Sequence, residues 1–485
     1  MKKSDSIGKQ INIGSIIALL SNGIAKSSQL ISRAIITRAS GAFGLGLFEL
    51  VLSLTRWLAL IGQGGAHQTI VQFTSSLRSK EDWNGVLNVF IQSLLIVLSV
   101  TGLLCVIVFA LSDWVMKTLM EGITDRTVLL QVLFLTILLS LAHFLGFYFR
   151  GLKRLVFDQA INTVAFPILV LSVSAYYYFL DDSFEIQSVL WVVIGLYGVM
   201  ILASLTGAII LSFKNVKGWK WKSQYRNLFH YSWPIWINSI LNASRAQFSR
   251  LLIPVFSTTV ELGYFSAAYT LAFMVSFVGN SFTPVNQYLV AEAHGEADTE
   301  KIKKVYNNIV SKSMSFVILL LGGSIIFGEL ILGLLFGSDF KMVYPLLVIL
   351  VLGESINAIS GPAGNILLMT GNQKISTKIM LVGFILLSVF CVLLIPHYGA
   401  MGSAIAAAIS ISYINLSRVI IIRRLFGILP NYRSILKHNK LLLLLVAVFF
   451  GLKLFIIAGT AHVYVLLSMF MVLGASLLFK AIRKV

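Results

Sequence analysis

The chain has 485 residues, of which 57% are hydrophobic and only 12% are charged, and its formal net charge is +19. Soluble domains carry about 25% charged residues, so this composition excludes an ordinary water-soluble protein and favours an all-α integral membrane protein. The apolar runs are continuous, which argues against the alternating segments of a membrane barrel. The positive charge suits basic loops at a membrane surface, and no nucleic-acid partner is expected.

The apolar runs predict about fourteen membrane-spanning helices, because one span needs about 20 mostly apolar residues. Their centres lie near residues 24, 54, 98, 139, 168, 200, 242, 274, 322, 354, 387, 411, 449 and 470. Polar residues weaken the first, seventh and eighth of these helices, so 12 or 13 spans is the alternative. Most of the 38 Lys and Arg residues fall in alternate connecting segments, which predicts an even number of spans and two cytoplasmic termini.

An internal repeat relates the two halves. A shift of 217 residues places LGLFELVLSL, which begins at Leu45, on LGYFSAAYTL, which begins at Leu262, and Ser32-Arg33 on Ser249-Arg250. Parallel repeats of this kind are typical of transporters, with the substrate path at their interface.

We therefore predict a first lobe of six helices over residues 1–228, a second over 229–430, and two further helices over 431–485. The boundary between the lobes falls in a connector rich in Lys, Trp and Tyr, a composition that suits the headgroup layer.

Three of the predicted spans carry polar side chains on a single helical face. The members of these stripes are Asn22, Lys26, Gln29 and Arg33 in the first helix, Glu49, Ser53 and Arg56 in the second, and Asn238, Asn242, Arg245 and Ser249 in the seventh. Ionisable groups inside a membrane normally face the bundle interior or a water-filled cavity. The stripes predict a central cavity between the halves, lined by helices 1, 2, 7 and 8.

The predicted cavity is cationic. Lys26, Arg56 and Arg245 lie near mid-depth, while Glu49 is expected to pair with Arg33 or Arg56. Excess positive charge favours an anionic ligand, and arginine matches phosphate through bidentate hydrogen bonds. The candidate substrate-binding residues are Lys26, Arg56, Arg245, Asn22, Asn242, Arg33 and Arg250.

Two groups of candidates have structural alternatives. Arg33 and Arg250 lie near outer helix ends, where snorkelling or a structural lock is as good an explanation as ligand contact. Arg245 lies on the polar stripe, whereas Arg250 is matched by Arg33 in the repeat, so Arg250 is interpreted as a feature of the ancestral lobe. Glu354 and Asn357 fit either an ion site or hydrogen bonds between helices, and Glu49 has the same two readings.

The sequence predicts no enzymatic site. Cys105 and Cys391 lie inside apolar runs without metal-ligand spacing, so no metal, disulfide or cofactor is expected. No phosphate-binding loop of the nucleotide-hydrolysing type occurs.

Several pieces of the chain resemble a known family. They are GAFGLGLFELVLSL, RGLKR, VELGYFSAAYTLAFMVSF, LLFGSDF, GNILLMTGNQK and HYGAMGSAIAAAIS. Their order and spacing are similar to those of the polysaccharide transporters of the multidrug/oligosaccharidyl-lipid/polysaccharide exporter superfamily, which include the O-antigen flippases. The resemblance covers nearly the whole chain.

The resemblance implies a transporter of two six-helix lobes in the bacterial inner membrane. It implies that an undecaprenyl-pyrophosphate-linked oligosaccharide is flipped from the inner to the outer leaflet by alternating access. The cationic cavity would hold the pyrophosphate or acidic sugars. Candidate partners are this lipid-linked oligosaccharide, membrane lipids and a glycan polymerase complex.

Three other functions compete with this interpretation. A multidrug exporter of the same superfamily needs acidic residues for cation coupling, and the first and seventh helices contain none. A peptidoglycan lipid-precursor flippase shares the fold and the sign of the cavity, so it remains an alternative. A membrane glycan polymerase or ligase usually carries a large external loop, for which this chain has no room.

Overall fold

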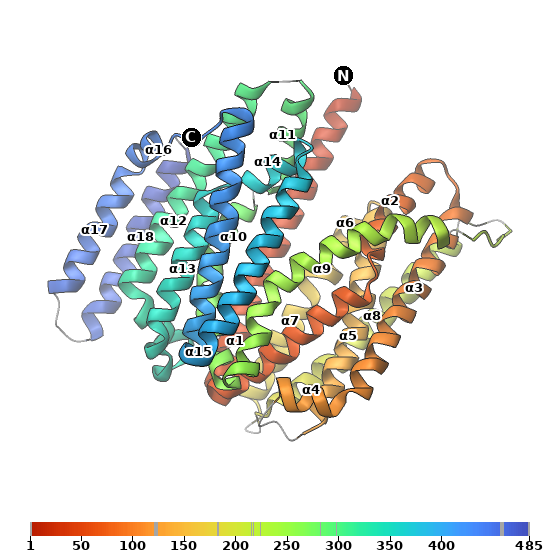
Figure 1. Cartoon of the computed structure of the whole chain (residues 1–485), viewed down its shortest axis with the longest axis horizontal. Coiled ribbons are helices and arrows are strands. Elements are labelled where there is room, and N and C mark those ends of the chain that lie inside the picture. Colours follow the sequence, from red (N-terminus) through yellow and green to blue (C-terminus); the bar gives the residue numbers. More distant parts are fainter. Residues whose placement is uncertain are drawn as a thin grey trace. The chain divides into compact units, whose positions relative to one another are not determined.

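The computed structural model describes residues 2–120, 125–181, 184–214, 216, 218–223, 225–281, 283–296, 298–455 and 460–483. Inside some helices only the backbone is described, as at Asn238, Asn242 and Arg245. The described residues form helices joined by short connections, and no strand occurs among them (Figure 1). The predicted all-α fold class is confirmed.

The chain divides into two compact units, Met1–Gly263 and Tyr264–Val485. The helices of the N-terminal unit are α1 (Lys2–Gly62), α2 (Ala66–Ser79), α3 (Trp83–Ala110), α4 (Ser112–Leu119), α5 (Thr127–Gly151), α6 (Leu155–Gln159), the π-helix η1 (Ala160–Val164), α7 (Ala165–Phe179), α8 (Ile186–Phe213) and α9 (Tyr225–Phe256). Helix α10 (Thr259–Ser281) begins in this unit and continues into the next. The lobe boundaries drawn from the sequence stay a prediction.

Within the N-terminal unit, α1 packs against α5, α7 and α9, while α5 also contacts α3 and α8 (Figure 1). The core between these helices is aromatic and aliphatic. Phe90 stacks at a tilt against both Phe144 and Tyr148, and all three side chains are buried. The buried hydroxyl of Tyr148 forms a hydrogen bond of 2.5 Å with Ser212 of α8, which satisfies a polar group that would otherwise be costly to bury.

A sharp kink divides α1 at Gly41, whose backbone angles are φ 66° and ψ −164°. This positive φ is open to glycine and strained for other residues. The repeat shift of 217 residues places Gly41 on Thr258, and the chain breaks there too, because α9 ends at Phe256 and α10 begins at Thr259.

The segments that follow these two breaks cross very closely. A Cβ on Gly46 would lie 1.9 Å from the carbonyl oxygen of Thr259, and a Cβ on Gly263 would lie 2.0 Å from that of Ala42. The same shift relates Gly46 to Gly263 and Ala42 to Thr259. The contact is therefore reciprocal, and only glycine leaves room for it.

The C-terminal unit is built around α12. Its further elements are α11 (Thr283–Gly295), α12 (Thr299–Phe336), the 3₁₀ helix η2 (Ser338–Val343), α13 (Tyr344–Ile359), α14 (Ala363–Met369), α15 (Gln373–Phe426), α16 (Tyr432–His438), α17 (Lys440–Phe455) and α18 (Thr460–Arg483). Helix α12 packs against α13, α17 and α18, and α13 packs against α15 (Figure 1). Asp298 caps α12 by accepting a hydrogen bond of 2.8 Å from the backbone N–H of Lys301, a typical N-cap contact.

The protein is a multi-pass membrane protein. Among the described residues, eight helical stretches are long and apolar enough to cross a membrane, or nine if the bent pair Tyr432–His438 and Lys440–Lys453 forms one span. Two of the eight, Leu20–Gly62 and Gln373–Phe426, contain kinks at Gly41 and Gly399. Each of these two is longer than the roughly 60 Å that two crossings need. All fourteen predicted centres lie within helices, and the count itself stays a prediction.

Candidate functional site

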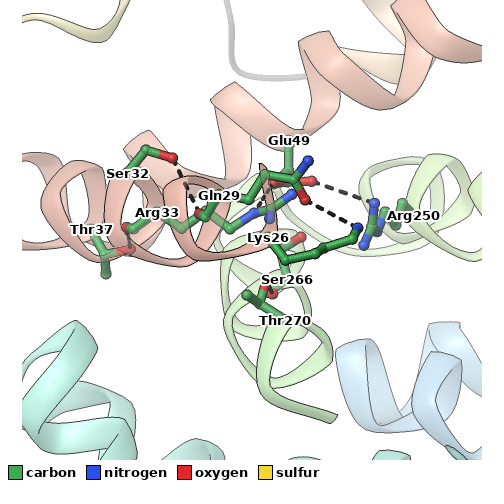
Figure 2. A network of polar contacts seen from close by, with 9 residues as sticks. All are labelled: Lys26, Gln29, Ser32, Arg33, Thr37, Glu49, Arg250, Ser266 and Thr270. Atoms are coloured by element: carbon green, nitrogen blue, oxygen red, sulfur yellow. Dashed lines mark hydrogen bonds and ion pairs between the residues drawn. The ribbon is translucent and has the colours of Figure 1, made fainter. Parts of the chain in front are cut away.

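The polar stripe of the first predicted span lies on α1 and is partly buried. The Lys26 ammonium donates a hydrogen bond of 3.2 Å to the side-chain oxygen of Gln29 (Figure 2). The Asn22 amide donates to the carbonyl oxygen of Ala18 at 2.8 Å, within its own helix. Arg33, one turn beyond Gln29, is buried and points toward Glu49, which follows the kink at Gly41.

Two arginines hold the carboxylate of Glu49. Arg33 Nε lies 2.6 Å from Glu49 Oε1, and Arg250 Nη1 of α9 lies 3.5 Å from Glu49 Oε2 (Figure 2). Arg33 and Glu49 belong to the same helix but are 16 residues apart, so they meet because α1 folds back at Gly41. We call Arg33, Glu49 and Arg250 the charged triad.

The charged triad is almost completely enclosed. The side chain of Glu49 is 0% exposed, and those of Arg33 and Arg250 are 8% and 9% exposed. Burying a lone charge costs several kcal/mol, and close, hydrogen-bonded partners offset that cost. Two guanidinium groups and one carboxylate leave an excess of one positive charge. Glu49 Oε2 accepts no hydrogen bond from the described residues, so its contact with Arg250 is an ion pair at a longer distance than that between Arg33 and Glu49 Oε1.

A small pocket opens beside the triad, with about 250 Å³ of empty space, open surroundings included. Its polar wall consists of Gln29, Ser32, Arg33 and Arg56 of α1. Its apolar wall consists of Phe48 and Leu52 of α1 and of Phe166, Pro167 and Val170 of α7. Among the described residues, Arg56 has no ion-pair partner within 4 Å. The pocket thus combines positive charge with a surface that apolar or sugar groups can contact.

Glu49 pairs with Arg33, one of the two partners that the sequence offered for it. Arg250 is a second partner, which the sequence analysis did not name. Arg250 therefore joins α9 to α1 through an ion pair, in addition to being the repeat counterpart of Arg33. The side chains of Arg245 and Asn242 lie outside the described part of the chain, so their roles stay predictions.

The second acidic candidate, Glu354, accepts hydrogen bonds from two neutral side chains within the C-terminal unit. The hydroxyl of Ser276 on α10 donates a short hydrogen bond to Glu354 Oε2 of α13. The Asn357 amide donates to the hydroxyl of Ser276 at 3.0 Å and to Glu354 Oε2 at 3.3 Å. These contacts join α10 to α13. In the described part of the chain, no three His, Cys, Asp or Glu residues gather in a way that could hold a metal ion.

Sequence reasoning missed two parts of the site. One is α7, whose Phe166, Pro167 and Val170 form the apolar wall, because no polar residue marks that face. The other is the bond between Glu49 and Arg250. The signal for it was present in the repeat, which places Ser249-Arg250 on Ser32-Arg33.

Comparisons with known proteins agree with this architecture. The model of a family described as polysaccharide biosynthesis protein matches residues 12–285, more than half of the chain. The probable low-salt glycan biosynthesis flippase Agl15 of Haloferax volcanii is 23% identical over 273 residues, which are 50% of this chain and 54% of that protein. The capsular polysaccharide biosynthesis protein CapF of Staphylococcus aureus is 25% identical over 193 residues, which are 39% and 48% of the two chains. The chain thus matches about half the length of these curated relatives.

Two solved structures share the fold over most of their length. The lipid II flippase MurJ, in an inward closed conformation, matches with a TM-score of 0.73 at 12% identity, covering 96% of this chain and 99% of that one. An inward-facing MATE family multidrug transporter matches with a TM-score of 0.63 at 13% identity, covering 85% and 98%. Such low identities establish the fold alone. The family match, which spans more than half of the sequence, shows that the chain belongs to the polysaccharide biosynthesis protein family.

Proposed function

We propose that the protein is a flippase for a lipid-linked oligosaccharide. It moves the glycan head group from the inner to the outer leaflet by alternating access, without chemical conversion. The substrate carries an anionic phosphate linkage, of the undecaprenyl-pyrophosphate class, and both termini of the protein lie in the cytoplasm. Names of relatives support this reading, since one is a glycan biosynthesis flippase and another acts in capsular polysaccharide biosynthesis.

The observation that carries the proposal is the excess positive charge buried within a membrane-spanning helix. The charged triad carries one more positive than negative charge, and Arg56 in the wall of the pocket adds another. An enclosed cationic site with little access to water attracts an anion strongly. Guanidinium groups bind phosphate oxygens in pairs, and the apolar wall from α7 gives the sugar or lipid carbon atoms a surface to contact.

The sign of the site argues against export of cationic drugs. Glu49 is the only acidic residue between residues 6 and 80, and it is already bound by two arginines. The stretch from residue 186 to residue 260, which includes α9, contains no acid at all. A cation arriving at this part of the N-terminal unit would therefore meet like charges. The peptidoglycan precursor is an anionic lipid of the same chemistry, so only substrate analysis separates it from a polysaccharide repeat unit.

The test is complementation of a strain that lacks the gene. Lys26, Arg33, Arg56, Arg245 and Arg250 are replaced one at a time by Gln, and surface glycan and lipid-linked intermediates are measured together. We expect the Lys26 and Arg56 variants to export little glycan at normal protein levels, and the lipid-linked oligosaccharide to accumulate. Arg126→Gln serves as the control, because Arg126 pairs with Asp113 on the surface with both side chains largely exposed.

The accumulated lipid identifies the substrate. Its glycan composition distinguishes a polysaccharide repeat unit from a peptidoglycan precursor. Full export by every cavity variant, at wild-type protein levels, would remove the basis for the cationic site. Absence of any lipid-linked glycan from the deletion strain would instead contradict the flippase function itself.

A further inference from the structure

A short extended segment between α8 and α9 is tied to the side of α3. The Asn88 amide donates a hydrogen bond of 2.9 Å to the carbonyl oxygen of Lys220, and the Gln92 amide donates one of 2.8 Å to that of Lys222. The indole N–H of Trp219 donates in turn to Asn88 Oδ1 at 3.2 Å. We call residues 219–223 the strap.

The spacing of these bonds shows that the strap has a defined conformation. Asn88 and Gln92 are four residues apart on a helix, which corresponds to about 6 Å along its axis. Lys220 and Lys222 are two residues apart in an extended chain, which spans about 6.6 Å. The two side-chain amides on α3 therefore have the same spacing as the two carbonyl groups of Lys220 and Lys222 that they bind. Asn88 is 1% and Gln92 0% exposed, so these buried amides depend on the strap for hydrogen bonds.

Tryptophan and lysine alternate along the strap. Trp219 and Trp221 are about half exposed, with their rings edge to face at 6.0 Å, and Lys220 and Lys222 are exposed. In an extended segment, successive side chains point to opposite sides. Among the described residues neither lysine has an ion-pair partner, whereas Lys301 and Lys303 of the C-terminal unit pair with Glu296 and Glu300.

The position along α3 places the strap near a membrane surface. Helix α3 has 28 residues, or about 42 Å, against a hydrocarbon core of about 30 Å. The helix therefore exceeds the core by about 12 Å, and the strap is bound to its second and third turns, within about 14 Å of the end at Trp83. Tryptophan is enriched at this level of a bilayer, where its ring meets the acyl boundary while lysine reaches the phosphates.

We propose that the strap binds anionic phospholipid headgroups of the adjacent leaflet. Lys220 and Lys222 contact the phosphates, and Trp219 and Trp221 insert at the level of the acyl ester groups. Residues 186–260 contain no acid. The acids at the start of α3 are Glu81 and Asp82, and Asp82 accepts a hydrogen bond from the backbone N–H of Gly85, so it serves as the cap of that helix. This inference is independent of the flippase function, since none of its residues belongs to the charged triad or the pocket.

The experiment places a fluorescent label beside the strap and asks which lipid surrounds it. Cys105 and Cys391 are both buried; they are replaced by Ala, and Ser223→Cys is labelled in the full-length protein. The protein is reconstituted into vesicles of phosphatidylcholine and phosphatidylglycerol, with bromine on one lipid or the other. Quenching of the label reports the local concentration of each lipid.

We expect brominated phosphatidylglycerol to quench several times more strongly than brominated phosphatidylcholine. Lys220→Gln and Lys222→Gln should each lower this preference, and the double variant should remove it, because each basic residue contributes to binding at an anionic surface. Asn88→Ala combined with Gln92→Ala should also reduce it, because the lysines then lose their fixed positions. The control, Lys301→Gln with Lys303→Gln, removes the same charge from paired lysines and should leave the preference unchanged.

Equal quenching by the two lipids in the unsubstituted strap would overturn the proposal. Loss of the preference on addition of about 1 mM inorganic pyrophosphate at constant ionic strength would also overturn it, because the strap would then be a site for a soluble anion. A preference that survives loss of both lysines would also overturn it. Glycan export in the same variants separates this proposal from the flippase function.

Discussion

Two buried glutamates, one in each unit of the chain, are held in different ways. Glu49 on α1 lies between the guanidinium groups of Arg33 and Arg250, whereas Glu354 on α13 accepts hydrogen bonds from the Ser276 hydroxyl and the Asn357 amide. Both are shielded, at 0% and 3% exposure. Burial alone therefore does not distinguish a binding site from a structural link; the charge of the partners does.

The difference decides what each cluster can do. The triad leaves one surplus positive charge next to a pocket, so it can receive an anion. The Ser276 hydroxyl and the Asn357 amide are neutral donors, and their hydrogen bonds join α10 to α13. The described contacts of Glu354 therefore hold two helices together. Matched substitutions in the two clusters test this distinction.

The largest difference is expected from the same isosteric change at both glutamates. Glu49→Gln leaves two buried guanidinium groups without a counter-charge and should lower the free energy of unfolding by about 3–5 kcal/mol. Glu354→Gln keeps an acceptor oxygen for Ser276 and should cost about 1 kcal/mol. Thermal and denaturant unfolding of the purified protein in detergent measures both. Equal losses of unfolding free energy would show that the charge of Glu49 stabilises the protein no more than the charge of Glu354 does.

The two arms of the triad should differ in strength. Arg33→Gln removes the 2.6 Å contact and should cost about 2–3 kcal/mol, whereas Arg250→Gln removes the 3.5 Å contact and should cost about half as much. In the double variant Glu49→Gln/Arg250→Gln one surplus charge is gone, so its loss should be smaller than the sum of the single losses. Strict additivity in unfolding measurements would mean that Arg250 and Glu49 do not interact.

The glycine beside each cluster offers a third comparison. A Cβ on Gly46 would lie 1.9 Å from a backbone oxygen, while one on Gly353 would lie 3.0 Å from the Cα of Ala408. Gly46→Ala should therefore lower stability by about 1–3 kcal/mol through overpacking, and Gly353→Ala by less. Gly102→Ala is the control, since nothing lies within 4 Å of its Cβ position. A Gly46 variant as stable as the control would contradict the close crossing.

The smallest effect concerns two buried serines of the second copy. Ser276→Ala removes a donor to Glu354 and should cost about 1 kcal/mol. Ser266, the repeat counterpart of Glu49, is fully buried, and its hydroxyl has no hydrogen-bond partner among the described residues. Ser266→Ala should change stability by less than about 0.5 kcal/mol. A large loss from Ser266→Ala would reveal a polar contact at that position.

Much of the fold could be predicted because its causes are local. Apolar runs determine helices, and the stripe of Lys26, Gln29 and Arg33 follows from helical spacing alone. The span centres near residues 24 and 54 predicted a break between them, but not its position at Gly41, although the repeat places that glycine at the equivalent break before α10. A glycine in a span is common, so its presence alone does not indicate a kink.

The partners within the site depend on tertiary structure and could not be deduced in the same way. Periodicity put Glu49 and Arg56 on one face of one helix, and it left both Arg33 and Arg56 open as partners of Glu49. The fold brings Arg33 to Glu49 from before the kink and adds Arg250 from α9. The apolar wall of α7 carries no chemical mark in the sequence, so only the packing of α1 against α7 reveals it.

The reciprocal glycine crossing has a consequence for how charge can be placed around it. Its contacts are isologous, as at the two-fold axis of a homodimer, where each side chain occurs twice. A dimer of identical halves could bring only even numbers of carboxylates to such an axis. In this single chain, position 49 is Glu and its counterpart at position 266 is Ser, while arginine is kept at both 33 and 250. Because the two copies are joined in one polypeptide, a single carboxylate can lie beside a crossing whose backbone contacts are symmetric.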